Sequence, residues 1–363
     1  MKWNESVLSL KPYQPGKSVD EVKKQLGLNE ITKLASNENP YGSSDITKQA
    51  LYEWNRSFAL YPDGYATVLR SALANLYNVR ETQLIFGNGS DEIIQIISKS
   101  LLEPGKNTVM PTPSFPQYKH NAVLQLAESR EVALVEGAHD LNEMLNRVDE
   151  HTSVVWLCSP NNPTGLYIHN GDLINFLEQV PSNVLVVLDE AYYEYVTAED
   201  YPDTLAFLEK FPNIIILRTF SKIYGLAGFR VGYGIASEEI ISKLEPAREP
   251  FNVNSLGMYV AAKALEDQTF IVECKKKNAE GLEKFYRFCN ESGLNYYPSQ
   301  GNFILIDFGI DSDEVFQFLL SKGFIVRSGK ALGFSTSIRI TVGTEEQNEK
   351  LIQFMKEFIK TPV

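Results

Sequence analysis

Short apolar runs alternate with amphipathic segments in the middle of the chain, from residue 84 to about residue 235. The clearest runs are residues 84–86, 154–157, 184–188 and 214–217. Strands that are apolar at every position are buried on both faces, which is typical of a parallel sheet covered by helices. The pattern therefore predicts a large, doubly wound α/β domain with a mostly parallel sheet.

Helical periodicity flanks this region on both sides. The apolar residues Ile46, Ala50 and Leu51 share one face of a helix that begins near residue 45. Further helices are expected over residues 19–26, 67–77, 255–292 and 345–359. Strands are expected over residues 302–308, 323–326 and 337–342. The C-terminal elements form an α+β pattern, which predicts a second and smaller domain.

These patterns divide the chain into three parts. Residues 1–40 form an irregular arm, which we expect to pack on the small domain or on a partner subunit. Residues 41–248 form the large α/β domain, where we expect the main ligand site, and residues 249–363 form the small α+β domain.

Composition and charge narrow the class of partner. The 363 residues carry a net charge of −12, which argues against nucleic acid or an anionic membrane as a partner. No apolar run approaches the roughly 18 residues of a membrane helix, and the first residues lack the apolar segment of a secretory signal. The three cysteines show no C-x-x-C spacing, and the four histidines show no metal-ligand spacing. We therefore expect a cytoplasmic protein that binds no metal.

Polar and glycine-rich segments follow the four apolar runs directly. They are GNGSDE (residues 87–92), SPNNPTG (159–165), DEAY (189–192) and TFSKIYGLAGFRVGYG (219–234). Ligands of open α/β sheets bind beyond the carboxyl ends of the strands, so we expect the four segments to meet at one site.

Each segment has an ordinary structural explanation when it is taken alone. GNGSDE is explained by a helix N-cap at Ser90 or Asp91, or by an anion cradle at the helix start. It lacks the third glycine of a dinucleotide fingerprint and the Gly-Lys-Ser/Thr of a P-loop, which argues against a nicotinamide dehydrogenase. NNPTG alone predicts a turn. Asp189 alone is explained by a helix cap, Tyr192 by packing and Lys222 by a solvated loop.

Together the segments indicate one cofactor, pyridoxal phosphate (PLP). This cofactor needs a lysine that anchors it covalently, an acid facing its ring nitrogen, donors for its phosphate and a donor to its phenolate oxygen. Arginine suits the phosphate because its planar fork binds two oxygens at once. Lys222 would be the anchoring lysine, and Asp189 the acid that faces the ring nitrogen. Asn162 and Tyr192 would bind the phenolate oxygen. The residues expected around the phosphate are Gly89, Ser90, Asp91, Thr219, Ser221 and Arg230. The glycines expected to allow tight backbone turns around the site are Gly225, Gly228, Gly232 and Gly234.

On these motifs the chain resembles the fold-type I PLP-dependent aminotransferases, and within that family the histidinol-phosphate aminotransferase branch. The resemblance spans nearly the whole chain and includes YQPGK near the start, SNENPYG (36–42), YPDG (61–64), PFNVN (250–254), NFIL (302–305), IVRSG and IRITVG. SNENP, PFNVN and the form of the lysine segment are typical of the histidinol-phosphate branch.

The resemblance implies further roles. Lys222, Asp189 and Tyr192 would be the catalytic residues, and Phe115 would stack on the cofactor ring. Many members of the branch have Tyr at that position, so a phenol is lost here while stacking is kept. Tyr61 would reach the cofactor phosphate of a partner subunit, because the family forms homodimers with shared active sites.

The resemblance also implies that Arg339 binds the anionic group of the substrate. Alternation in SIRITV places Arg339 on the polar face of a strand with Ser337 and Thr341, which a solvated face explains equally well. Weaker candidates for contact with the substrate are Arg327, Asn39 and Tyr13.

The implied reaction is transamination in two half-reactions. Histidinol phosphate and 2-oxoglutarate would give imidazole acetol phosphate and glutamate in histidine biosynthesis, with Lys222 as general base and acid. An aromatic aminotransferase acting on tyrosine or phenylalanine and a phosphothreonine decarboxylase stay open as alternatives, because loop geometry decides the substrate. A non-catalytic PLP-binding regulator would carry a DNA-binding domain, which neither the first 40 residues nor the acidic charge favours.

Overall fold

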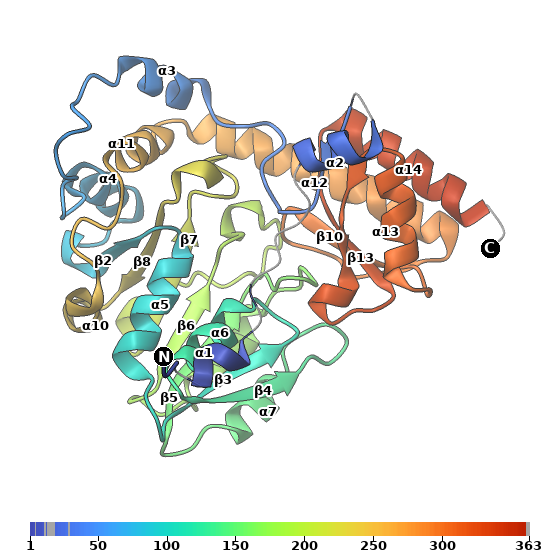
Figure 1. Ribbon diagram of the computed structural model, residues 1–363. Coiled ribbons are helices and arrows are strands. Elements are labelled where there is room, and N and C mark those ends of the chain that lie inside the picture. The colour runs from blue at the N-terminus through green and yellow to red at the C-terminus, as the bar shows by residue number, and fades with distance from the viewer. Residues whose placement is uncertain (4, 11, 13–18, 28–29, 361–363) are drawn as a thin grey trace.

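A computed structural model describes residues 1–3, 5–10, 12, 19–27 and 30–360 of the chain. Its elements form two groups, one around a seven-stranded sheet and one around a four-stranded sheet (Figure 1). The fold class is the expected one, with a large, mostly parallel α/β group and a smaller α+β group.

The seven-stranded sheet has the strand order β2-β8-β7-β6-β5-β3-β4, and β8 runs antiparallel to both of its neighbours. The strands are β2 (Leu84–Gly87), β3 (Asn107–Thr112), β4 (Glu128–Ala133), β5 (Thr152–Cys158), β6 (Leu185–Asp189), β7 (Ile214–Thr219) and β8 (Gly232–Ala236). The four predicted apolar runs correspond to β2, β5, β6 and β7, which confirms those strands.

Successive residues of each strand face opposite sides of the sheet, and both sides are covered by helices. In β5, Val154 and Trp156 pack with α5 (Ser90–Leu101), α6 (Gln117–Leu124) and α10 (Glu238–Leu244). Val155 and Leu157 pack on the other side, with α4 (Thr67–Tyr77), α8 (Asn170–Leu177) and α11 (Ser255–Ala264). Figure 1 shows α5 in front of the sheet. The remaining short helices of this group are α3 (Asp45–Glu53), α7 (Leu141–Asn146) and α9 (Phe207–Lys210).

The second group is built on an antiparallel sheet of order β12-β13-β10-β9. Its strands are β9 (Asn295–Tyr296), β10 (Phe303–Asp307), β12 (Arg327–Ser328) and β13 (Ser337–Thr341). Ile338 and Ile340 of β13 lie in a core shared with the helices. These helices are α12 (Gln268–Ser292), α13 (Ser312–Ser321) and α14 (Glu345–Lys360).

Two predicted elements differ from the structure. The single helix expected over 255–292 is wrong, because α11 ends at Ala264 and α12 begins at Gln268. Asp267 starts the new helix by accepting a 3.1 Å hydrogen bond from the amide of Phe270. The strand expected over 323–326 is shortened to β11 (Phe324–Ile325), which pairs with β1 (Thr32–Lys33).

The N-terminal arm touches both groups of elements. Helix α1 (Glu5–Ser9) lies against α6, whereas Val22 of α2 (Val19–Leu26) packs with Leu320 and Ile325. The division into three parts stays a prediction. Because Met258 and Val260 of α11 belong to the core of the large sheet, we propose that the domain boundary lies within α12 rather than at residue 249.

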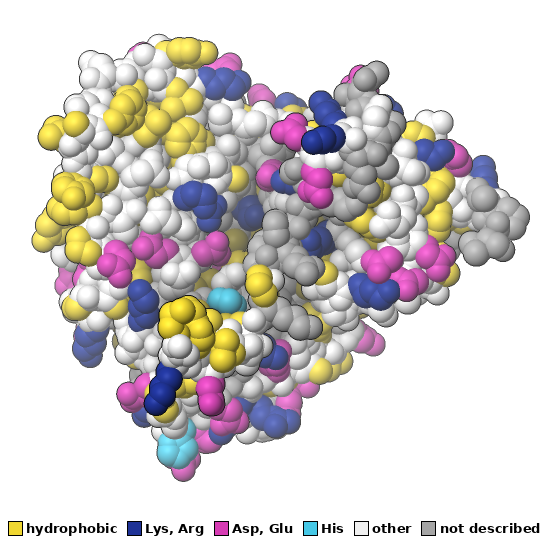
Figure 2. All heavy atoms as spheres, viewed as in Figure 1, with side chains coloured by type: hydrophobic (Ala, Val, Ile, Leu, Met, Phe, Trp, Pro, Cys, Tyr) yellow, Lys and Arg dark blue, Asp and Glu magenta, His cyan; other side chains and the backbone are white. Residues whose placement is uncertain are grey.

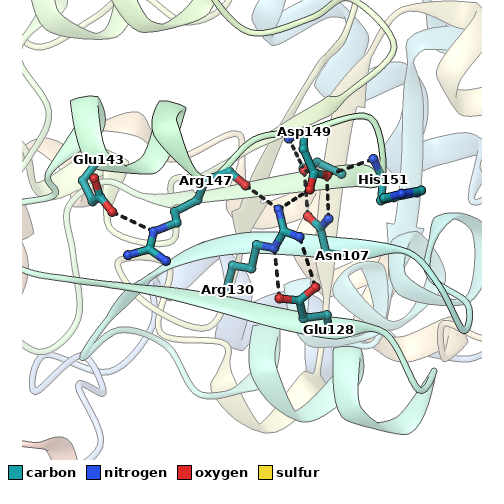
Figure 3. A network of polar contacts seen from close by, with 8 residues as sticks. Asn107, Glu128, Arg130, Glu143, Arg147, Asp149 and His151 are labelled. Atoms are coloured by element: carbon teal, nitrogen blue, oxygen red, sulfur yellow. Dashed lines mark hydrogen bonds and ion pairs between the residues drawn. The ribbon is translucent and has the colours of Figure 1, made fainter.

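A polar network holds the amino-terminal ends of β3, β4 and β5 (Figure 3). The carboxylate of Asp149 accepts hydrogen bonds from Asn107 Nδ2 at 2.8 Å and from Arg130 Nη1 at 2.7 Å. Thr152 Oγ1 donates to Asn107 Oδ1 at 2.7 Å. These bonds hold the pKa of Asp149 well below its usual value. The network therefore fixes the amino-terminal end of these three strands, and the opposite, carboxyl end of β5 carries the segment 159–165 singled out above.

Within the described ranges, no helix is long and apolar enough to cross a membrane. The same residues contain no cluster of three or more His, Cys, Asp or Glu side chains arranged to bind a metal ion.

Candidate active site

Lys222 lies in a tight turn just beyond the end of β7. The amide of Gly225 donates a 2.9 Å hydrogen bond to the carbonyl of Lys222, which closes the turn. Gly225 has a φ of +69°, and a Cβ there would overlap the carbonyl of Gly42, so the position requires glycine. The Nζ of Lys222 lies 3.5 Å from the carbonyl of Ser36 and 5.4 Å from the ring centroid of Tyr192.

The surroundings of Lys222 favour its neutral amine. Burial lowers the pKa of Lys222 to about 8, and the nearby positive charge of Arg339 acts in the same direction. A lysine needs a neutral amine to act as a nucleophile or a base, and the lowered pKa makes this form of Lys222 accessible closer to neutral pH than for an ordinary lysine.

Asp189 ends β6 and is 3% exposed. Its Oδ2 accepts a 2.7 Å hydrogen bond from the phenol of Tyr118, and its Oδ1 accepts one from the amide of Ala191 at 3.2 Å. Burial raises the pKa of Asp189 to about 6, and the hydrogen bond from Tyr118 opposes this rise. Tyr118 in turn stacks on Trp156, with ring centroids 4.9 Å apart.

Arg339 connects the small sheet with the large one. Its Nη1 donates a 2.6 Å hydrogen bond to Oδ1 of Asn162, and its Nη2 donates a 2.7 Å bond to the carbonyl of Ala35. Ser337, Arg339 and Thr341 share one face of β13, as alternation predicts, but all three are buried and Arg339 is only 7% exposed. The alternative of a solvated face is therefore wrong.

Tyr192 is buried three residues beyond the end of β6. Its phenol accepts a 2.9 Å hydrogen bond from Nδ2 of Asn37, and its ring packs edge-on against Phe303. Burial raises the pKa of Tyr192, so the phenol stays protonated and remains available as a donor.

The expected phosphate-binding residues converge at the start of α5. Arg230 Nη1 lies 3.4 Å from Ser221 Oγ, and its Nη2 donates a 3.2 Å hydrogen bond to Asp91 Oδ2. Gly89 precedes the helix with a φ of +73°, and a Cβ there would lie 2.7 Å from Arg230 Nη2. Ser90 and Ser221 are buried nearby, and the amide of Ser221 is held by Thr219 Oγ1 at 3.1 Å. Glycine at position 89 thus allows the Arg230 guanidinium to lie directly against the start of α5.

Two of the expected turn glycines have a different role. Gly232 and Gly234 lie within strand β8 and not in turns, so the expectation of tight turns at these positions is wrong. A Cβ on Gly232 would overlap the amide of Ser90, so glycine is needed there because β8 passes directly against the start of α5.

Phe115 and Tyr61 lie in different surroundings. Phe115 is half-buried and packs edge-on against the ring of Tyr118, the residue that bonds Asp189, with ring centroids 5.7 Å apart. Tyr61 lies on the surface with 83% of its area exposed, and its ring stacks on that of Phe251 at 5.0 Å.

The three weaker candidates for contact with the substrate differ in their surroundings. Arg327 of β12 lies directly opposite Arg339 of β13, so the two side chains share one face of the sheet. Asn39 donates a 2.6 Å hydrogen bond to the carbonyl of Ile223 and accepts one from the amide of Tyr41 at 3.0 Å, so it braces the chain beside Lys222. Tyr13 lies outside the described residues.

Sequence reasoning missed the partners of the site residues. Tyr118 holds Asp189 and Asn37 holds Tyr192, and neither was singled out as a site residue. Asn37 lies in the SNENPYG segment, which was a usable signal. Tyr118 follows Phe115 by three residues at a helix start, and only the fold brings it to β6.

The chain is similar to known aminotransferases over almost its whole length. Residues 29–355 match the family model described as aminotransferase class I and II. A histidinol-phosphate aminotransferase of Geobacillus sp. (strain WCH70) is 62% identical over 351 residues, which cover 97% of this chain and 96% of that protein. The enzyme of the same name from Bacillus subtilis (strain 168) is 59% identical over 99% of this chain and 100% of its own.

The fold has a close match among solved structures. The crystal structure of histidinol-phosphate aminotransferase from Sinorhizobium meliloti in complex with pyridoxal-5'-phosphate superposes with a TM-score of 0.90, at 26% identity, covering 99% of this chain and 98% of that one. The matched family model and the high identity of the full-length relatives agree with the site geometry. The chain therefore belongs to the class I and II aminotransferase family.

Proposed function

We propose that this chain is a PLP-dependent aminotransferase that transfers the amino group of histidinol phosphate to 2-oxoglutarate, giving imidazole acetol phosphate and glutamate in histidine biosynthesis. The observation that carries the proposal is the placement of Lys222, Asp189 and Arg230 at one edge of the large sheet, where β6 and β7 end and the antiparallel β8 begins. The 62% identity to a histidinol-phosphate aminotransferase over 97% of the chain supports the substrate.

The residues present fit PLP. Gly89 allows the Arg230 guanidinium to lie at the start of α5, where this guanidinium and the backbone amides suit a phosphate. The buried Asp189 carboxylate suits a protonated ring nitrogen, and Lys222 offers an amine for the aldehyde. When bound, PLP would supply that aldehyde and a ring that accepts electrons from the substrate.

Each residue of the site would have a separate role in the reaction. Lys222, whose pKa is lowered to about 8, would act as the base that takes the proton from the α-carbon of the substrate and as the acid that later gives a proton back. Asp189, fixed by Tyr118, would keep a proton on the ring nitrogen. Tyr192 and Asn162 would orient the ring through its phenolate oxygen, and Phe115 would cover one face of the ring.

Arg339 would bind the anionic group of each substrate. It is already held rigidly by Asn162 and Ala35, so little order has to be gained on binding. Arg327 on the same face of the sheet supports a phosphorylated donor, because a dianionic phosphate suits two guanidinium groups better than a tyrosine or phenylalanine side chain does. Asn39 would act by positioning Lys222 and not by touching the substrate.

We also propose that the chain forms a homodimer and acts in the cytoplasm. An exposed apolar surface lies over α3, α4 and α11, where Figure 2 shows hydrophobic side chains gathered. It surrounds a cavity of about 380 Å³ lined by residues of the 54–69 segment and α11. Exposed members of this surface are Leu51, Tyr52, Phe58, Leu60, Tyr61, Tyr65 and Val68. A contiguous apolar surface of this kind favours a protein partner, and Tyr61 on it would serve the site of a second copy.

The test is covalent labelling of the purified enzyme. Borohydride reduction followed by peptide mapping should place a pyridoxyl group on Lys222, and Lys222→Ala should lose both the visible absorbance of the cofactor and turnover. Lys243→Ala, on an exposed face of α10, is the matched control and should change neither. A label at another lysine, or turnover in Lys222→Ala, would contradict the assignment. Release of a keto acid without carbon dioxide separates the reaction from a decarboxylation.

A further inference from the structure

Phe251 adopts a backbone conformation that bulky residues rarely accept. Its φ is +56°, in the left-handed region. The ring stacks on Tyr61 with centroids 5.0 Å apart, and a Cβ built on Gly64 would lie 3.4 Å from it. The ring therefore supports both ends of the exposed segment 61–64. Strained conformations persist where the surroundings hold them, and they cluster at functional sites.

The next residue, Asn252, anchors this segment to the start of α5. Its Nδ2 donates to the carbonyl of Phe86 at 3.1 Å and to Glu92 Oε2 at 2.9 Å. Its own carbonyl accepts a 2.8 Å bond from Asn88 Nδ2, and the Asn88 amide donates to Glu92 Oε2 at 2.6 Å. The Asn252 side chain is thus fixed to the turn that precedes the proposed phosphate site.

Arg248 closes the network on the other side. Its Nη1 donates to Asn252 Oδ1 at 2.9 Å, and its Nη2 donates to the carbonyl of Gly64 at 3.0 Å. The segment that carries Tyr61 is therefore held by a charge-assisted hydrogen bond at one end and by an aromatic stack at the other.

We propose that Phe251 is a positioning residue for Tyr61, held in its strained conformation by Asn252, and that it acts on the cofactor site of the second copy of the chain. The inference rests on the proposed function, in which Tyr61 serves the partner's phosphate. An exposed tyrosine without support would have to be ordered each time the cofactor binds, whereas the Phe251 ring orders it in advance. One short segment then supports two sites, its own through Asn252 and the partner's through Phe251.

The first test separates this role from a role in stability. Phe251→Gly removes the ring and relieves the left-handed backbone, so we expect unchanged or higher thermal stability together with weaker PLP binding. The expected rise in the PLP dissociation constant is about tenfold, the scale of one aromatic pair. The matched control is Leu126→Gly, with a φ of +60° and 51% exposure against 45% for Phe251, and it should leave PLP binding unchanged. Phe251→Tyr keeps the stack and should restore binding.

The decisive test uses mixed dimers in which Lys222→Ala disables one site. When Phe251→Gly is on the same chain as Lys222→Ala, the surviving site receives its Tyr61 from the altered chain and should bind PLP about tenfold more weakly. When the two changes are on different chains, the surviving site should bind PLP as tightly as the wild type does.

Equal affinities in the two arrangements, or the reverse order, would overturn the inference, and so would a monomeric wild type in light scattering. The readout of these tests is PLP binding and not activity. A failure of the proposed transamination is therefore distinguishable, because the wild type would then bind PLP without turning over histidinol phosphate.

Discussion

The phenol of Tyr118 donates a 2.7 Å hydrogen bond to Oδ2 of Asp189 at the carboxyl end of β6. This bond favours the ionised carboxylate, whose pKa burial raises to about 6. Tyr118→Phe should therefore raise the pKa of Asp189 further. Activity that needs ionised Asp189 is lost as pH falls through that pKa, so the acid limb of kcat should move to higher pH.

The measurement is a kcat profile from about pH 5 to 9, in which the variant should also lose about tenfold in rate at pH 6, the scale of one hydrogen bond to a charged group. Tyr167→Phe removes a tyrosine–aspartate bond elsewhere, to Asp200, and is the matched control. An acid limb that stays in place in Tyr118→Phe would argue that Asp189 does not govern it.

Lys222 should destabilise the cofactor-free chain at neutral pH. Its pKa falls from the ordinary value of 10.5 to about 8 in the folded chain, so the unfolded chain binds more protons between these two values. Stability therefore rises with pH in this window, and the penalty is full below about pH 8.

Lys222→Met should raise the melting temperature of the cofactor-free chain at pH 7, and the gain should shrink as pH approaches 10. Lys243→Met, on the surface of α10, should show no such gain. Melting curves by calorimetry at several pH values provide the check. A gain that is independent of pH would mean that the charge of Lys222 is not its cause.

Arg339 and Arg327 should affect the two substrate pairs differently. Arg339→Gln should lower kcat/KM about 100-fold for both histidinol phosphate and glutamate, the upper scale of a hydrogen bond to a charged group. Arg327→Gln should lower kcat/KM about tenfold for histidinol phosphate and leave glutamate nearly unchanged. Steady-state kinetics with each donor is the measurement. Equal losses on both donors in Arg327→Gln would remove the assigned role in phosphate recognition.

Gly232 should not tolerate a side chain. A Cβ there would overlap the Ser90 amide, so Gly232→Ala should push α5 away from β8 and cost about 1–3 kcal/mol in the free energy of unfolding. PLP should also bind more weakly, because the start of α5 moves. Gly171→Ala on α8 meets no atom within 4 Å and is the control, with no loss of PLP binding expected. The measurements are denaturant unfolding and PLP titration of both variants. If Gly232→Ala behaves like Gly171→Ala, close packing against α5 is not the reason for glycine at position 232.

The sequence predicts the central strands well because their residues are apolar at every position. β5, β6 and β7 carry this pattern, and the polar segment that follows each strand can be recognised from the sequence as well. β4 was not predicted because it is an edge strand with a single buried side chain, so its apolar signal is weak. β8 was not predicted because its glycines resemble turn signals, although they serve close packing against α5.

The site residues that can be proposed from the sequence are those whose side chains carry the required chemistry themselves, such as Lys222 and Asp189, and their roles stay a prediction. Burial of Arg339 is not predictable from the alternation of β13, because a polar face is buried only when another part of the chain covers it. Here that part includes Ala35 and Asn162, far away in sequence. Tyr118 was missed for the same reason, since its contact with Asp189 exists only in the folded chain.

The central claim is that the donor is histidinol phosphate. The most direct test is the relative kcat/KM of the purified enzyme for histidinol phosphate, tyrosine and phenylalanine, with 2-oxoglutarate as the common acceptor. We predict that histidinol phosphate exceeds both aromatic donors by about 100-fold or more, because a buried site that binds a phosphate through guanidinium groups rejects donors that lack it. Equal or higher values for tyrosine or phenylalanine would contradict the account.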